Sequence, residues 1–80
     1  MASTPMGRAV AEVITDRCRA DGISHYRLSE LTGIPRTTLA RRLGDGDFNI
    51  TELLNVAREL NTTPEALLAD ARRLTEALTA

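Results

Sequence analysis

The side chains with the clearest chemistry in this sequence are arginines and threonines that lie close together between Arg36 and Arg42. In a helix that turns about 100° per residue, Thr37 and Arg41 lie on the side opposite Leu39 and point away from a core. A guanidinium donates paired hydrogen bonds to phosphate oxygens or to a guanine edge, and a threonine hydroxyl is a shorter donor and acceptor. These residues favour hydrogen bonding to a nucleic acid.

Catalytic and metal-binding groups are not indicated. The chain has one cysteine and one histidine, which excludes an internal disulfide and a four-ligand zinc site within one chain. We find no nucleophile with a base, no carboxylate pair and no glycine-rich phosphate loop, so we expect no enzyme activity, cofactor, metal or small-molecule ligand. Cys18 follows Val10 and Ile14 at intervals of four, which predicts a buried thiol on a helix.

Charge is distributed unevenly along the chain, although the net charge is only −1. Residues 17–43 hold six arginines and two acids, a balance of +4, whereas residues 44–80 hold three arginines and seven acids, a balance of −4. The small net charge argues against a protein that coats nucleic acid indiscriminately. The basic segment is the part that suits a polyanion.

The composition predicts one small helical domain spanning residues 1–80. Aromatic residues make up 2% of the chain and aliphatic residues must fill the core, which favours packed helices over a sheet. No apolar run is long enough to span a membrane, and the first residues lack the features of a signal peptide. We therefore expect a cytoplasmic protein.

Capping and turn residues predict an all-α fold of five helices. The expected helices cover about 5–20, 25–32, 35–43 and 50–60, with the fifth starting at Pro64, and the stretch from Gly44 to Asp47 is expected to be a loop. Asn49 and Glu52 have the spacing of a reciprocal helix cap. The apolar positions predict a core of Val10, Ile14, Leu28, Leu31, Ile34, Leu39, Leu43, Leu53, Leu54, Ala57 and Leu60.

The second and third expected helices, with the turn between them, form a helix-turn-helix unit over residues 24–43. Ser29 and Ala40 are small enough to lie where the two helices cross. Gly33 can adopt the positive φ that the turn needs. Such a unit can place its second helix in the major groove of DNA.

An ordered series of short motifs extends beyond this unit, over about Ile23 to Leu68. It comprises Leu28-Ser29 before Gly33-Ile34, then Arg36-Thr37-Thr38-Leu39, then Phe48-Asn49-Ile50 before Glu52-Leu53-Leu54, then Ala57 to Leu60, and finally Thr63-Pro64-Glu65-Ala66-Leu67-Leu68. With this series the chain resembles the Cro and phage-repressor (lambda-repressor-like) family of DNA-binding domains. The resemblance implies a five-helix fold with the helix-turn-helix at its second and third helices.

The resemblance also implies roles for individual residues on a double-stranded DNA operator. The positions that match base-reading residues are Arg36, Thr37 and Arg41. The positions that match phosphate contacts are Ser24, His25, Tyr26, Thr38 and Arg42. Two departures weaken the match: Pro35 replaces a serine cap, and Asp45 and Asp47 place negative charge in a loop that approaches phosphate in relatives.

The function implied is that of a sequence-specific DNA-binding transcriptional regulator, of the Cro-like or immunity-type repressor kind found in phages and prophages. An antitoxin or a host regulator with the same fold is an alternative. From another class, a helical protein-interaction module that does not bind DNA is also an alternative. The polar and cationic side of the third helix favours DNA over a protein partner.

An apolar stripe in the fifth helix bears on assembly. It consists of Leu67, Ala71, Leu74 and Leu78, at intervals of four, three and four. We expect Leu74 and Leu78, within a dimerisation extension over about 72–80, to contact a second copy and form a homodimer on DNA. In the alternative, the stripe packs back on the first helix and the protein is a monomer.

Overall fold

The computed structural model describes residues 4–79 of the chain, with side chains up to residue 77. Within that range the structure consists of five α-helices without strands, as the sequence predicts. They are α1 (Pro5–Asp21), α2 (His25–Thr32), α3 (Arg36–Asp45), α4 (Ile50–Glu59) and α5 (Pro64–Thr79). None of the described helices is long and apolar enough to cross a membrane.

Side-chain caps start four of the five helices, because the first backbone N–H groups of a helix need acceptors. Thr4 accepts from Gly7 N at 2.9 Å, and Ser24 accepts from Arg27 N at 3.0 Å. Asn49 and Glu52 form the predicted reciprocal cap of α4, and Thr63 caps α5. The N-cap of α3 is Pro35, which makes no side-chain hydrogen bond, as expected.

The end of α3 differs from the prediction. Gly44 and Asp45 were expected in a loop, but both are helical, and the helix ends at Gly46 with a φ of 74°. The Asp45 carboxylate accepts from Asp47 N at 2.8 Å, and the turn begins two residues later than the glycine-rich composition suggested. Gly46 lies directly against α1, where a Cβ would overlap the carbonyl of Gly7.

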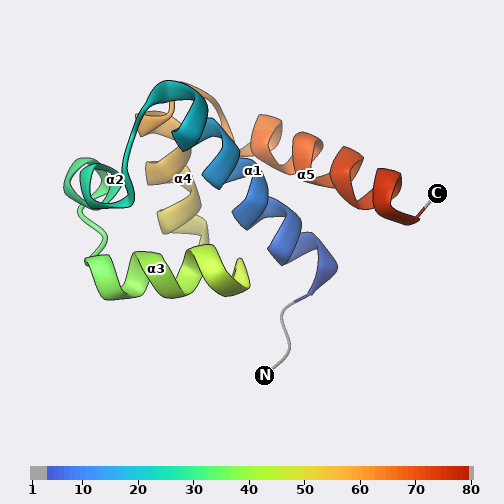
Figure 1. Ribbon diagram of the computed structural model, residues 1–80, viewed down its shortest axis with the longest axis horizontal. Helices are drawn as coiled ribbons and strands as arrows, with labels where there is room; N and C mark the ends of the chain where they lie inside the picture. The colour runs from blue at the N-terminus through green and yellow to red at the C-terminus, as the bar shows by residue number, and fades with distance from the viewer. Residues whose placement is uncertain (1–3, 80) are drawn as a thin grey trace.

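The helices enclose one core (Figure 1). α1 packs mainly on α5 and α3, and α2 packs on α3 and α4, so α1 lies between the last helix and the third. The largest fully buried side chains are Ile14, Leu28, Leu39, Val56 and Leu67. The Cys18 thiol is buried as predicted, and its burial, with Asp21 nearby, raises its pKa.

Two apolar side chains of α4 lie outside the core. Leu54, predicted to be buried, is 51% exposed, and Ile50 is 75% exposed although it was assigned to the same apolar stripe. The buried side of α4 is formed by Leu53, Val56, Ala57 and Leu60, and Leu54 lies at the flank of that side. Ile50 is the first residue of the helix, directly after its N-cap Asn49.

The remaining core predictions were largely confirmed. Leu31 and Leu43 are half-buried rather than buried, and Leu43 packs against the core cluster together with Phe48. The α5 stripe packs within the chain: Leu67 and Ala71 are fully buried, and Leu74 lies partly buried against the core. These three residues of the stripe therefore contribute to the core of a single chain, in which α5 packs on α1.

Candidate nucleic-acid interface

The turn between α2 and α3 is held by hydrogen bonds from two hydroxyl side chains of α2. The Ser29 hydroxyl donates to the Ile34 carbonyl at 2.6 Å. The Thr32 hydroxyl donates to the Leu28 carbonyl at 2.7 Å and accepts from Ile34 N at 3.3 Å. Gly33 adopts a φ of 76°, as predicted. These bonds fix the angle at which α3 leaves the turn, and with it the direction of its side chains.

The three residues predicted to read bases are all exposed on α3. Thr37 and Arg41 lie on the side opposite Leu39, which is 1% exposed, and Arg36 lies nearer the flank of Leu39, at the start of the helix. Thr38 is half-buried, at the edge of the exposed side. The helical geometry thus places one hydroxyl and two guanidinium groups on a surface that a ligand can approach.

Arg36 and Arg41 keep their charge available. Among the side chains of residues 4–77, ion pairs hold Arg17, Arg19, Arg27, Arg42, Arg58 and Arg73, and none involves Arg36 or Arg41. A guanidinium without a carboxylate partner retains all its N–H donors for a phosphate or a base edge. These two arginines are therefore the cations of α3 that are best placed to bind an anionic ligand.

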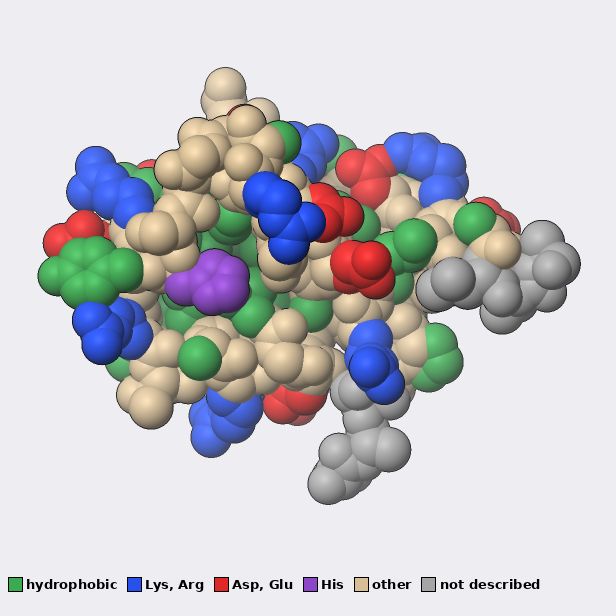
Figure 2. Space-filling model, viewed as in Figure 1, with side chains coloured by type: hydrophobic (Ala, Val, Ile, Leu, Met, Phe, Trp, Pro, Cys, Tyr) green, Lys and Arg blue, Asp and Glu red, His purple; other side chains and the backbone are tan. Residues whose placement is uncertain are grey.

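An open hollow of about 320 Å³ lies between the start of α2 and the start of α3. Its lining residues are His25, Tyr26, Arg36, Thr37 and Ala40, so it brings together two predicted phosphate contacts and two predicted base-reading residues. Figure 2 shows this face with the only histidine, in purple, between the two helices and with arginines placed singly around it. Ala40 is exposed at this hollow, where a larger side chain would fill the space between α2 and α3.

Within this hollow the guanidinium of Arg36 lies over the ring of Tyr26. The distance from Arg36 Cζ to the ring centroid is 5.1 Å, within the range of a cation–π contact. Tyr26 is 54% exposed, so its ring forms part of the surface. Sequence reasoning missed this contact, because the two residues are ten positions apart and belong to different helices.

The N-terminus of α2 supplies the other predicted contacts. Ser24, His25 and Tyr26 are exposed there, beside the first backbone N–H groups of the helix. The positive end of a helix dipole attracts anions such as phosphate. The Ser24 oxygen already accepts from Arg27 N, which leaves its O–H as a donor.

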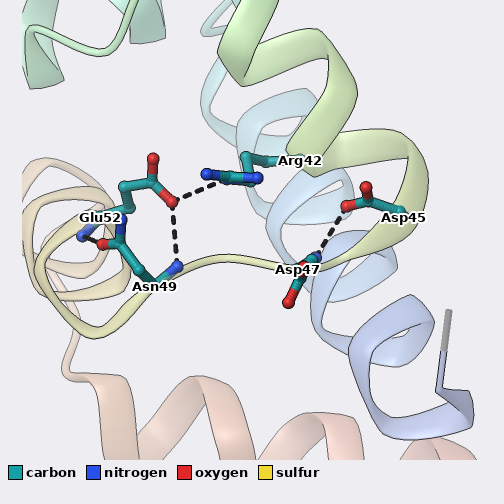
Figure 3. A network of polar contacts seen from close by, with 5 residues as sticks. All are labelled: Arg42, Asp45, Asp47, Asn49 and Glu52. Carbon is teal, nitrogen blue, oxygen red and sulfur yellow. Dashed lines mark hydrogen bonds and ion pairs between the residues drawn. The ribbon is translucent and has the colours of Figure 1, made fainter. Parts of the chain in front are cut away.

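Arg42 has a different environment from its neighbour Arg41. Its Nε donates to Glu52 Oε1 at 2.8 Å, and its side chain is only 20% exposed. Figure 3 shows this ion pair beside the cap of α4, where the same carboxylate oxygen accepts from Asn49 N at 2.9 Å. A phosphate would therefore compete with Glu52 for the Arg42 guanidinium. In the structure, the Arg42 side chain joins α3 to α4.

The protonation of this pair follows from its contacts. Burial alone would raise the pKa of Glu52, but the hydrogen bonds from Arg42 and from Asn49 N, with the arginine charges, lower it below its usual value. The hydrogen bond to Glu52, together with the nearby acidic charges, raises the pKa of Arg42 despite the desolvation that would lower it. Both groups are therefore charged at neutral pH.

Two acidic residues at the end of α3 and just after it differ in exposure. Asp47 is exposed, whereas Asp45 is half-buried and accepts from the Asp47 backbone.

As for assembly, Leu74 packs partly on the core, and the side chain of Leu78 lies outside the described residues. Other large apolar side chains on the described surface are Tyr26, Ile50, Leu54 and Leu68. No group of three or more potential ligands within the described residues could hold a metal ion.

Comparison with known proteins identifies the family of this domain. Residues 14–70, more than two thirds of the chain, match the family model of the Cro/C1-type HTH DNA-binding domain. Searches of curated proteins and of solved structures gave no match. The matched segment includes α2, the turn and α3, and it extends the resemblance drawn from the sequence on both sides. The chain therefore belongs to the Cro/C1-type helix-turn-helix family of DNA-binding domains.

Proposed function

We propose that the protein is a repressor that occupies a DNA operator, with α3 in the major groove and α2 across the phosphate backbone. The observation that supports this most is the outward side of α3, where Arg36 and Arg41 are exposed and have no carboxylate partner among the described residues. A protein-interaction module would present an apolar centre on its contact surface, and none of the exposed large apolar residues of the described chain lies on α3.

In this proposal Arg41 is the principal base-reading residue. Its guanidinium donates two hydrogen bonds to O6 and N7 of a guanine, and Thr37, one turn earlier, contacts a neighbouring base or a thymine methyl. Arg36 reads a base near the end of α3 that enters the groove first. Ser24, His25, Tyr26 and Thr38 bind phosphate oxygens and hold the domain in register without reading sequence.

Repression follows from occupancy alone, since a domain seated in the major groove over a promoter excludes other proteins from it. We propose a Cro-like or immunity-type repressor of a phage or prophage, which binds as a homodimer in the cytoplasm. An antitoxin or host regulator would use the same surface on another operator.

The test is selection of bound sequences from a random DNA pool, followed by transcription from a promoter that contains the selected site. We expect one enriched motif with two-fold symmetry and a fall in transcription as protein is added. An increase in transcription would show an activator. No enriched motif, with a salt-insensitive protein partner recovered in its place, would overturn the proposal in favour of the interaction module.

A further inference from the structure

We propose that Tyr26 determines specificity by positioning Arg36, and that it does so with its ring rather than with its hydroxyl. The proposal rests on the function proposed above. Its basis is the placement of the Arg36 guanidinium over the Tyr26 ring, at 5.1 Å from the centroid, in the hollow between α2 and α3. This role is distinct from the phosphate contact that the family resemblance implies for Tyr26.

Arg36 needs such support because of its place in the fold. It is the first residue of α3, where the positive end of the helix dipole repels a cation and the first turn holds no acidic residue. Pro35 before it offers no side chain to hydrogen-bond with it. An arginine side chain also has many rotamers, so without a partner it would sample directions that do not reach a base.

A ring supports this arginine without neutralising it. A carboxylate would occupy the N–H donors that a guanine edge needs, and it would repel the DNA backbone. The face of a tyrosine attracts the guanidinium through its π electrons and leaves the in-plane N–H donors free. Tyr26 is 54% exposed and lies two residues after the N-cap of α2. It can therefore direct Arg36 from the helix that we propose to lie across the DNA phosphate backbone.

The two possible roles of Tyr26 use different atoms, and conservative variants separate them. Tyr26→Phe keeps the ring and removes the hydroxyl, whereas Tyr26→Leu removes both. A role for the ring predicts that Tyr26→Phe retains base discrimination at the position that Arg36 reads, and that Tyr26→Leu reduces it. A cation–π contact at an exposed site corresponds to about a two- to fivefold change in that discrimination.

The experiment titrates wild type, Tyr26→Phe, Tyr26→Leu, Arg36→Ala and the Tyr26→Leu/Arg36→Ala double variant against the selected operator, its single-base variants and unrelated duplex at fixed salt. We expect Arg36→Ala to abolish preference at one position. Tyr26→Leu should reduce preference at the same position about two- to fivefold and should add nothing to Arg36→Ala. Arg58→Ala, on α4 and outside the proposed interface, serves as the control.

A measurement on the free protein checks the contact itself. Protons of the Arg36 side chain should be shifted upfield in the NMR spectrum by the ring current, relative to those of Arg41, and the shift should disappear in Tyr26→Leu. Equal chemical shifts for the two arginines would overturn the proposal. So would a Tyr26→Leu variant that weakens binding to every duplex alike and leaves the preference at every position unchanged, because that result assigns Tyr26 to the phosphate backbone alone.

The outcomes also separate this inference from the proposed function. A wild-type protein that selects a motif, with Tyr26→Leu showing an unchanged preference at every position, would overturn the inference alone. A wild-type protein without any sequence preference would overturn the proposed function, and the inference with it. Thermal melts of each variant confirm that the exposed substitutions leave the domain folded.

Discussion

At the scale of single residues, Arg41 and Arg42 show that charge alone does not assign a role. They are adjacent in α3, yet a rotation of about 100° directs one to solvent and the other to Glu52. Arg42 gives its Nε–H to a carboxylate inside the molecule, whereas Arg41 has no ion pair among the described side chains. The intramolecular partner of each guanidinium determines how many of its N–H donors are free to bind DNA.

The first prediction concerns Arg41. Replacing it by alanine should lower the affinity for the operator by about 1 to 3 kcal/mol per half-site and relax the preference at one base pair, because a bidentate contact to guanine is lost. His25→Ala should weaken binding to all sequences alike, as expected of a phosphate contact. The measurement is titration against operator, single-base variants and unrelated duplex. If Arg41→Ala weakens every duplex equally, Arg41 is a phosphate contact and base reading must come from Arg36 and Thr37.

The second prediction concerns the Arg42–Glu52 ion pair and pH. Contacts with Arg42 and Asn49 lower the pKa of Glu52 in the folded state, so this carboxylate stabilises the fold above its unfolded pKa of about 4.3 and ceases to do so as pH falls through the lower folded value. Glu52→Gln should therefore be less stable than wild type at pH 7, with the difference shrinking below about pH 4. Denaturant melts across that range measure it. A difference that is constant with pH would show that the charge of Glu52 contributes nothing.

At the scale of elements, the helix boundaries that could be predicted are those set by local chemistry. Ser24, the Asn49–Glu52 pair and Thr63 act within three residues of the backbone groups that they cap, so their spacing in the sequence is sufficient. The end of α3 could not be predicted in this way. The residues from Gly44 to Asp47 are all Gly or Asp, which suit either a turn or a helix end, and the close packing of Gly46 on α1 decides between the two.

Contacts between elements set the limit of what the sequence predicts about the site. The exposure of Thr37 and Arg41 followed from helical periodicity, because Leu39 marks the opposite side. The contacts Arg36–Tyr26 and Arg42–Glu52 did not follow from periodicity. Each joins residues ten positions apart in two different helices, and the packing of those helices determines whether they meet. Leu54 was misplaced for a related reason: periodicity defines a broad apolar stripe, and only packing shows which edge of it is covered.

The third prediction tests the contact between α3 and α1. Gly46→Ala should cost about 4 kcal/mol or more, because the residue has a positive φ and its new Cβ would overlap the backbone of Gly7. Gly22→Ala is the matched control: its φ is 69°, but nothing lies within 4 Å of a Cβ there. That variant should lose only about 1 to 2 kcal/mol, the cost of the left-handed conformation. Equal losses in thermal melts would show that α3 and α1 do not approach as closely as described.

At the scale of the whole molecule, the opposite charges of its two halves correspond to different parts of the fold. The segment with a balance of +4 contains α2 and most of α3, and the segment with a balance of −4 contains α4 and α5. Because a polyanion attracts the first and repels the second, the domain should approach DNA with its helix-turn-helix face forward. Arg17 on α1 and Asp70 on α5, 3.7 Å apart, lie where the two parts meet.

The size of the domain suits the half-site geometry of a dimer. Its extents are 37 × 28 × 20 Å, so two copies side by side can place their α3 helices about 34 Å apart, one turn of B-DNA. Binding two half-sites also gains affinity that one short recognition helix does not reach. A symmetric operator therefore requires an interface, and the end of α5 is the surface that we propose for it.

The last prediction tests that interface by sedimentation with and without operator. Wild type should form a complex of two chains per operator, and Leu74→Glu should reduce it to one chain at the same concentration, because a charge would be buried between the two α5 helices. Leu74 also packs partly on the core, so circular dichroism must show that the variant is folded. Leu54→Glu is the matched control, since it introduces the same charge at a side chain that is 51% exposed on α4. We expect it to leave the complex of two chains intact. A folded Leu74→Glu variant that still binds as two chains would exclude the α5 interface, and loss of the second chain in Leu54→Glu instead would place the interface on α4.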